Sequence, residues 1–323
     1  MITVIKQGNL ATIQDEGRRG YQAWGMPVSG AMDQYACHMA NLLAGNKVSA
    51  ALIEMVKEGL ILKFDKSQLV SVCGADMQGM VNDNPIENWS SFVVPDGGTL
   101  SFGGAVSGQC AYIAVHGGFD VPKVLGSRST YTVAGIGGYE GRMLHQGDML
   151  YLADDKEKKV CTTKIPPAYI PRYDRECTLR IMMGPQDSLF SQESIHQFLT
   201  GTYVVESSNR VAYQLTGPKI MPIAKTNIVS DAVSPGAVQI PSGGAPCIVA
   251  AADHGTTRGF AKIGYVIQAD LMNLIQAKDG NKIHFVAVTQ QEAVKYLKQE
   301  QQDYEAVKDY IEKSYFRTFK KNE

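Results

Sequence analysis

The residues best suited to chemistry in this sequence are polar and charged side chains that stand among glycines. The stretch 126–130 reads Gly-Ser-Arg-Ser-Thr and forms the most concentrated such motif. Two hydroxyls that flank an arginine on a loop can bind an oxyanion from several sides. Arg128 is therefore a catalytic candidate, and Ser127 and Ser129 are anion-binding candidates. The alternative is a turn whose hydroxyls satisfy backbone groups.

A second polar loop lies near the N-terminus, where residues 14–21 read Gln-Asp-Glu-Gly-Arg-Arg-Gly-Tyr. Asp15 is a candidate for proton transfer, and Arg18 could hold a carboxylate or phosphate in a two-pronged geometry. The alternative is a surface turn with a local Asp–Arg pair. Ser29 follows in a Ser-Gly-Ala-Met-Asp stretch before a predicted helix. There it either binds an anion at the helix N-terminus or simply caps the helix.

In the second half, one group of polar residues directly follows an apolar run at 247–252. Residues 253–259 read Asp-His-Gly-Thr-Thr-Arg-Gly, and Asp253 and His254 could transfer protons there. A lone histidine at a strand end is more often structural, and that alternative stays open. The anion-binding candidates of this half are Arg210, Gln239, Thr256, Thr257 and Arg258.

Composition excludes several classes of function. The net charge of −1 over 323 residues provides no global field for nucleic acid or an anionic membrane, so we expect neither partner. No run of about 18 apolar residues occurs, and the first residues do not resemble a signal peptide, so we expect a cytoplasmic protein. No phosphate-binding P-loop or spaced His/Cys metal motif is present, and we expect no metal held by this chain alone.

The elements that must position these residues are mostly short strands. The 32 glycines fall between short β-branched runs, which indicates many strands joined by tight turns. Apolar residues at helical spacing predict helices near 32–43, 191–199 and 271–276, and Thr289 with Glu292 forms a capping box for a last helix. A proline-rich stretch at 161–175 is typical of a linker. We therefore predict domains at 1–160 and 175–290 and a C-terminal helical extension at 291–323.

With these motifs in hand, the sequence resembles the biotin-dependent carboxyltransferase-like family, also called allophanate hydrolase subunit 2 or KipA, and within it the PxpC type that serves 5-oxoprolinase. The likeness runs from about residue 3 to 290 and is carried by many short pieces. They are Thr12-Ile13-Gln14-Asp15 with Gly17-Arg18, Ser29-Gly30-Ala31-Met32-Asp33, Ala40-Asn41-Leu42-Leu43, Gly117-Gly118 with Asp120-Val121-Pro122, Leu125-Gly126-Ser127-Arg128-Ser129-Thr130, Gly184-Pro185-Gln186-Asp187, Asn209-Arg210, Pro235-Gly236-Ala237-Val238-Gln239, and Asp253 with Thr256-Thr257 and Gly259.

The resemblance implies a mainly β fold: two tandem cyclophilin-like β-barrels with a few short helices and a C-terminal helix. It implies the PxpC-type subunit of an ATP-dependent 5-oxoprolinase that opens 5-oxo-L-proline, its small-molecule substrate, to L-glutamate. The implied partners are a KipI-like (allophanate hydrolase subunit 1-like) protein and a LamB/YcsF-like subunit. ATP with Mg²⁺ is the implied cofactor, at a site shared with or carried by a partner. The sequence departs from the family where His254-Gly255 follows Asp253 and where Arg258 replaces a glycine.

Two other functions fit the same family. One is the carboxyltransferase subunit of a biotin-dependent, urea-type carboxylase. This chain has no Met-Lys-Met biotin-attachment motif, so the biotin would have to be carried by another protein. The other is a KipA-type regulatory protein that antagonises an inhibitor of a histidine kinase.

Overall fold

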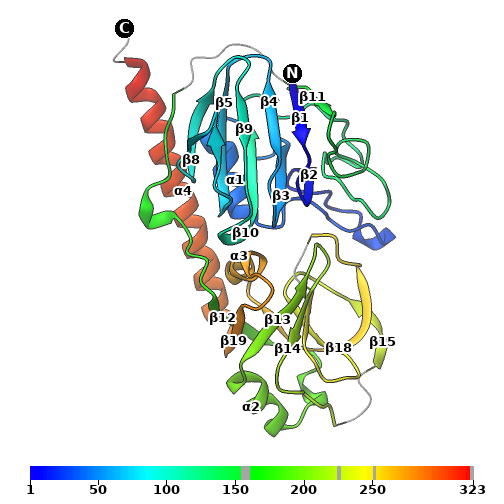
Figure 1. The fold of residues 1–323 in the computed structure, drawn as a ribbon. Helices are drawn as coiled ribbons and strands as arrows, with labels where there is room; N and C mark the ends of the chain where they lie inside the picture. The colour runs from blue at the N-terminus through cyan, green and yellow to red at the C-terminus, as the bar shows by residue number, and fades with distance from the viewer. Residues whose placement is uncertain (154–160, 224–226, 250–251, 321–323) are drawn as a thin grey trace. The chain divides into compact units, whose positions relative to one another are not determined.

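The computed structural model describes residues 1–153, 161–223, 227–249 and 252–320. The chain divides into two compact units. Unit 1 consists of Met1–Arg18, Ser29–Arg172 and the chain from Gln302 onward, and unit 2 of Arg19–Val28 and Tyr173–Gln301. Figure 1 shows both units as mainly β, as the sequence predicts.

Unit 1 is built from two antiparallel sheets that share one apolar core. Across the second sheet, Ile13, Ile53 and Ile113 stand opposite one another in register, and all belong to that core. Such rows of β-branched residues favour strand pairing. The first sheet contains, in order, β11 (Met149–Leu150), β1 (Ile2–Lys6), β4 (Ile61–Phe64), β9 (Thr99–Ser101), β6 (Met80–Val81) and β7 (Asn84–Pro85). The second contains β2 (Leu10–Gln14), β3 (Leu52–Val56), β10 (Ser107–Val115), β5 (Gln68–Asp76) and β8 (Ser90–Val94).

Helix α1 (Gln34–Leu43) packs against β5 and β10 of the second sheet. Its N-cap is Asp33, whose carboxylate accepts a hydrogen bond from the Ala36 N–H at 3.0 Å. Ser29 therefore does not cap the helix, and that alternative is wrong. It lies four residues earlier, buried and with a left-handed φ of 55°. The apolar spacing located the helix, whereas the aspartate decides where it begins.

Unit 2 is a closed barrel, because β12 pairs with both β19 and β18. The ring runs β12 (Glu176–Met183), β19 (Lys282–Ala287), β13 (Tyr203–Ser208), β14 (Tyr213–Thr216), β17 (Cys247–Val249), β16 (Ala237–Ile240) and β18 (Thr257–Val266), with β15 (Asn227–Ala232) added beside β18. Helices α2 (Gln192–Thr200) and α3 (Gln268–Gln276) contribute to its core, where Phe198 of α2 stacks on Phe285 of β19. The strands of this closed barrel all come from the second half of the chain.

The last helix, α4 (Gln290–Lys320), begins at the predicted capping box. The Glu292 carboxylate accepts from the Thr289 N–H at 2.7 Å, and the Thr289 hydroxyl accepts from the Glu292 N–H at 3.3 Å. The predicted mainly β fold with a C-terminal helix is confirmed. Three 3-10 helices, Gln22–Trp24, Pro167–Tyr169 and Asp187–Leu189, complete the described elements.

Part of the stretch expected to be a linker is attached to unit 1. The Ser91 N–H donates to the Thr163 carbonyl, and the Ile165 N–H donates to the Trp89 carbonyl. Ile165 is buried, so this segment packs beside β8 as part of unit 1. Its prolines are compatible with this, because they leave the N–H groups of Thr163 and Ile165 in place.

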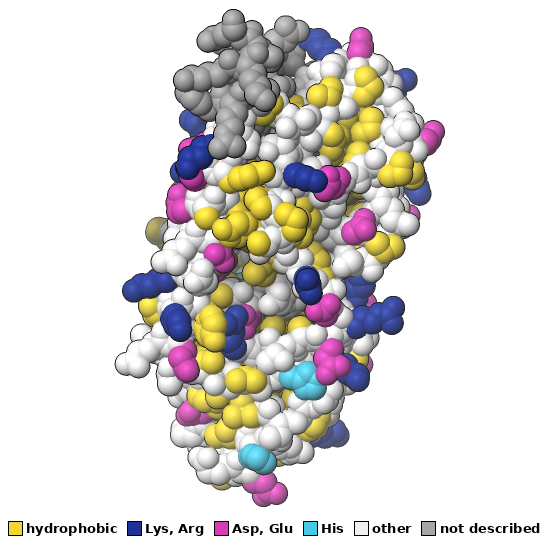
Figure 2. All heavy atoms as spheres, turned by 90° about the vertical axis from the view of Figure 1, so that its left-hand side faces the viewer, with side chains coloured by type: hydrophobic (Ala, Val, Ile, Leu, Met, Phe, Trp, Pro, Cys, Tyr) yellow, Lys and Arg dark blue, Asp and Glu magenta, His cyan; other side chains and the backbone are white. Residues whose placement is uncertain are grey.

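The surface mixes charges of both signs. Figure 2 shows lysines and arginines interspersed with acidic and hydrophobic side chains on one face of the molecule, in keeping with the net charge of −1. Within the described part of the chain, none of the helices combines the length and the hydropathy needed to cross a bilayer.

Candidate functional site

The Gly-Ser-Arg-Ser-Thr loop of unit 1 starts from a tight turn. The Val124 N–H donates to the Ser127 carbonyl at 2.8 Å, and Leu125 and Gly126 between them both have positive φ, 53° and 79°. Two successive left-handed residues make the sharp reversal that short hairpins use, and glycine adopts this conformation without steric cost. The turn directs Ser127, Arg128 and Ser129 toward the end of β2.

The carboxylate of Asp15, directly after β2, organises this loop. Its Oδ1 accepts from the Ser127 hydroxyl at 2.6 Å, the Ser129 hydroxyl at 2.5 Å and the Gly17 N–H at 2.8 Å. Its Oδ2 accepts from the Arg128 N–H at 2.6 Å. Asp15 is only 6% exposed, so these four bonds replace its hydration. The structure thus brings the 127–129 segment onto a carboxylate that the sequence places more than a hundred positions away.

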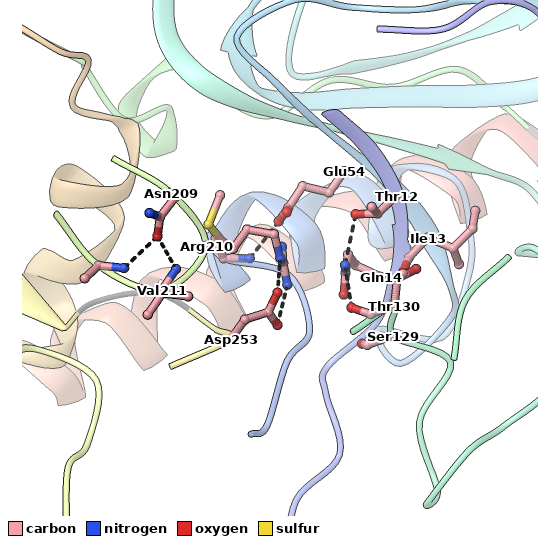
Figure 3. Close-up of polar contacts among 12 residues, drawn as sticks. Thr12, Ile13, Gln14, Glu54, Ser129, Thr130, Asn209, Arg210, Val211 and Asp253 are labelled. Carbon is pink, nitrogen blue, oxygen red and sulfur yellow. Dashed lines mark hydrogen bonds and ion pairs between the residues drawn. The ribbon is translucent and has the colours of Figure 1, made fainter. Parts of the chain in front are cut away.

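Further bonds attach the loop to the strand. Thr130 donates both its N–H and its hydroxyl to the Ile13 carbonyl, at 2.9 and 2.8 Å. The Gln14 amide donates to the Thr130 carbonyl at 3.2 Å and to the Thr12 hydroxyl at 2.9 Å (Figure 3). The side chains of Thr12, Gln14 and Thr130 are all buried, so these bonds join the loop to β2 away from solvent.

Arg18 is almost completely buried, at 1% exposed. Its guanidinium donates to the Ser129 carbonyl, which fixes the backbone of the loop from another side. Gly138 allows a second segment to approach, because a Cβ there would lie 1.8 Å from the Thr130 hydroxyl oxygen. Within unit 1, Arg18 therefore supports the loop.

A polar pocket of about 460 Å³ lies beside Arg128. The Arg128 Nε donates to the Val121 carbonyl at 3.0 Å, which places the guanidinium at the pocket wall. The charged and titratable groups that line the pocket are all basic, and no acidic side chain occurs among its described lining residues. These basic residues are Lys47, His116, Lys123 and Arg128.

His116 follows β10 directly and is half-buried. Its Nδ1 lies 2.7 Å from the Ala44 carbonyl, an acceptor only, so Nδ1 carries the hydrogen. Nε2 is then the nitrogen whose hydrogen-bonding role changes with protonation. The neighbouring Gly117-Gly118 entered the sequence analysis only as a piece of the family likeness, and His116 was not selected. Its place at the end of an apolar strand was the available signal, whereas nothing in the sequence indicated Lys47 or Lys123.

In unit 2 the structure pairs Arg210 with Asp253. The Arg210 Nε donates to Asp253 Oδ2 at 2.7 Å and its Nη2 to Oδ1 at 3.3 Å (Figure 3). The side chains are 7% and 4% exposed. The Asp253 N–H also donates to the Arg210 carbonyl at 2.8 Å, so the two residues are joined through the backbone as well as through their side chains. The sequence named both residues but gave no reason to pair them.

The other candidates of unit 2 surround the start of β18. Burial lowers the pKa of His254, and the positive charge of Arg258 acts in the same direction, so the ring is uncharged at neutral pH. The Gln239 amide is buried, and its Nε2 has no hydrogen-bond partner among the described residues. Thr257 opens β18, and the Thr256 carbonyl accepts from the Val233 N–H at 3.0 Å.

Cys247 of β17 pairs in register with Gln239 of β16, and its thiol is not activated as a nucleophile. Burial raises its pKa, and the positive charge of Arg258 offsets that rise only in part. A thiol with a raised pKa is a poor nucleophile at neutral pH. Among the residues that the structure describes, no group of three or more His, Cys, Asp or Glu side chains is placed to hold a metal ion.

Comparison with known proteins identifies the family. Residues 24–287 match the carboxyltransferase domain family, subdomains A and B. The chain is 34% identical to the C subunit of 5-oxoprolinase from Escherichia coli over 94% of this chain and 96% of that protein, and 35% identical to its counterpart from Haemophilus influenzae over 91% and 94%. The crystal structure of Kluyveromyces lactis urea carboxylase matches 95% of this chain with a TM-score of 0.89 at 29% identity, and this chain spans 29% of that one. The chain therefore belongs to the carboxyltransferase domain family of subdomains A and B.

Proposed function

We propose that this chain is the PxpC-type subunit of an ATP-dependent 5-oxoprolinase that acts with a KipI-like and a LamB/YcsF-like subunit. The observation that carries the proposal is the match to the C subunit of 5-oxoprolinase from Escherichia coli along nearly the whole of both chains. The likeness to urea carboxylase, in contrast, covers less than a third of that protein. The function of a separate subunit is therefore the better supported of the two.

The basic pocket of unit 1 suits the hydrolysis of 5-oxo-L-proline. 5-Oxo-L-proline carries a carboxylate, and its lactam is an amide whose resonance makes hydrolysis slow. ATP would supply the driving force, by phosphorylation of the lactam oxygen. Arg128 would hold negative charge on the substrate, with the loop kept in place by Asp15. Asp253 and His254 of unit 2 remain candidates for proton transfer.

The residues described fit the anionic part of Mg²⁺-ATP better than the metal. Lysine, arginine and histidine side chains line the pocket, and these bind phosphate oxygens well. Mg²⁺ prefers carboxylate and water oxygens, and the described residues provide no carboxylate cluster for it. The pocket would therefore hold phosphate oxygens of Mg²⁺-ATP, and the metal site would be shared with or carried by a partner subunit.

Reconstitution tests the proposal. The purified chain with both partner subunits, ATP and 5-oxo-L-proline is expected to release L-glutamate, and omission of this chain should abolish the release. Arg128→Ala should lose most of the activity while the chain stays folded, with Lys63→Gln, an exposed cation on β4, as the matched control. If glutamate forms equally without this chain, the proposal is wrong.

A second candidate is the carboxyltransferase step of a biotin-dependent carboxylase. It is favoured by the TM-score of 0.89 with urea carboxylase. Because the chain has no biotin-attachment motif, it would need a biotinylated partner. Recovery of a biotinylated protein with the tagged chain, together with ATP-dependent carboxylation of urea, would favour this candidate over lactam hydrolysis.

A further inference from the structure

The strongest unexplained feature of unit 1 is the charge of the pocket beside Arg128. Two lysines, one arginine and one histidine line a pocket of about 460 Å³, and the described lining contains no carboxylate. Basic side chains gathered at one pocket favour an anionic ligand. A single carboxylate would balance only one of them. A ligand with two negative charges on neighbouring oxygens fits the set better.

The walls of the pocket are fixed by hydrogen bonds that do not involve the cations. Asn46 accepts from the Gly117 N–H at 2.9 Å and donates to the Val115 carbonyl at 2.9 Å, which ties the loop after α1 to the end of β10. Gly118 has a φ of 67°, and a Cβ there would lie 3.1 Å from the Ala50 Cβ. The two loops therefore meet closely and form a preorganised wall.

The basic side chains of the pocket differ in how firmly they are held. Arg128 is anchored by its Nε bond to the Val121 carbonyl, and His116 by its Nδ1 bond to the Ala44 carbonyl. Lys47 and Lys123 are exposed, so their side chains can close over a ligand. An anchored guanidinium and an anchored imidazole in the wall, with two mobile lysines at its mouth, suit a compact tetrahedral anion, because such an anion presents oxygens in several directions.

We propose that this pocket binds a phosphate group, with Arg128 and His116 as the fixed contacts and Lys47 and Lys123 as the mobile ones. The site deepens the proposed function, on which it rests only for the source of the phosphate. That source is either a nucleotide or a phosphate released or carried during the reaction. The chemistry that the pocket recognises is the same in both cases.

Calorimetry with the full chain alone tests this site without any enzyme activity. Inorganic phosphate is expected to bind, and the affinity should fall with rising ionic strength because the contacts are charged. Lys123→Gln and Lys47→Gln should each weaken phosphate binding roughly tenfold, as expected for a lost charged hydrogen bond. Lys63→Gln should leave it unchanged. Both lysine variants alter exposed side chains, so folding is preserved and thermal melting confirms it.

The other arms separate the possible ligands. ADP that competes with phosphate and binds more tightly identifies a nucleotide as the source, whereas phosphate that binds without competition from ADP identifies the reaction's own phosphate. Binding of 5-oxo-L-proline with no binding of phosphate would overturn the inference, because the pocket would then be a carboxylate site. Absence of any binding, or binding unaffected by the lysine variants, would also overturn it. If reconstituted complex still releases glutamate in that case, the pocket assignment fails alone and the proposed function stands.

Discussion

Replacing Asp15 by alanine tests the inference that its carboxylate holds the Arg128 loop in place. The substitution removes the acceptor of four hydrogen bonds at once. The hydroxyls of Ser127 and Ser129 can rotate toward other acceptors. The N–H groups of Gly17 and Arg128 cannot, because the backbone fixes their direction.

The size of the effect follows from those two N–H groups. A buried donor left without a partner costs about 1–3 kcal/mol, so Asp15→Ala should destabilise the loop by about 2–6 kcal/mol. Asp15→Asn keeps the shape and one oxygen. Its NH₂ group must still face one of the two backbone N–H groups, because each carboxylate oxygen accepts from one of them. We therefore expect Asn to cost about half as much as Ala, about 1–3 kcal/mol.

Amide hydrogen exchange is the appropriate assay, because a chain of two units need not unfold in one step. A loss of about 2 kcal/mol speeds exchange about 30-fold where exchange requires local opening. The amides of Gly17 and Arg128 should show this acceleration in Asp15→Ala and a smaller one in Asp15→Asn. Asp96→Ala, which changes an exposed aspartate of the same unit, is the matched control.

One outcome would refute this reasoning. If Asp15→Ala abolished activity in the reconstituted complex but left exchange at the Arg128 amide as in the control, the carboxylate would act on substrate rather than on the loop. Comparable activity loss in Ser127→Ala and Ser129→Ala, each with faster exchange, would instead support positioning.

Three further predictions concern ionisable groups. Arg210→Ala should destabilise unit 2 in urea by about 3–5 kcal/mol, because it leaves the Asp253 carboxylate buried and unpaired, and a double Arg210→Ala, Asp253→Ala variant should recover part of this loss. Burial depresses the pKa of His254. The stability that this residue contributes should therefore be full above its usual pKa and be lost as pH falls below that pKa. Melting curves between about pH 8 and 5 should show that loss in the native chain and lack it in His254→Gln. Burial alone would raise the pKa of Asp148, but hydrogen bonds from Arg142 and a backbone N–H outweigh it and lower the pKa. Part of the stability of the native chain should therefore be lost below about pH 4, and acid melting curves of Asp148→Asn should lack that part of the loss.

Apolar spacing and the capping box were enough to locate the helices. The helix near 191–199 is α2 (Gln192–Thr200), and the capping box at Thr289 begins α4. These signals are local, because they depend on residues three or four positions apart. The prediction was less reliable where the decision depended on distant contacts. The stretch around Thr163 looked like a linker in composition, yet backbone bonds to β8 attach it to unit 1.

The candidate site followed the same rule. Glycine and charge located the loop at 126–130 and the polar loop at Asp15, but their union depends on the bonds of Thr130 to the Ile13 carbonyl and on the turn at Leu125. Neither is visible in a pattern of single residues. Lys123 and Lys47 escaped prediction for a similar reason, since an exposed lysine carries no local signal until the loops around it are placed.

The hydrogen bonds of Asp15 and Asp253 bear on which residues of this chain could transfer a proton. Asp15 accepts four hydrogen bonds, and Asp253 is held by the Arg210 guanidinium. A carboxylate in either situation can take up a proton only by giving up contacts that stabilise its own unit. The histidines are less constrained, because each has one ring nitrogen bonded to a carbonyl: Nδ1 of His116 to Ala44 and Nδ1 of His254 to Gly255. Among these four groups, proton transfer by a histidine would therefore break fewer hydrogen bonds than proton transfer by an aspartate. If neither His116→Asn nor His254→Gln changes the pH profile of the reconstituted complex, neither histidine is the proton carrier.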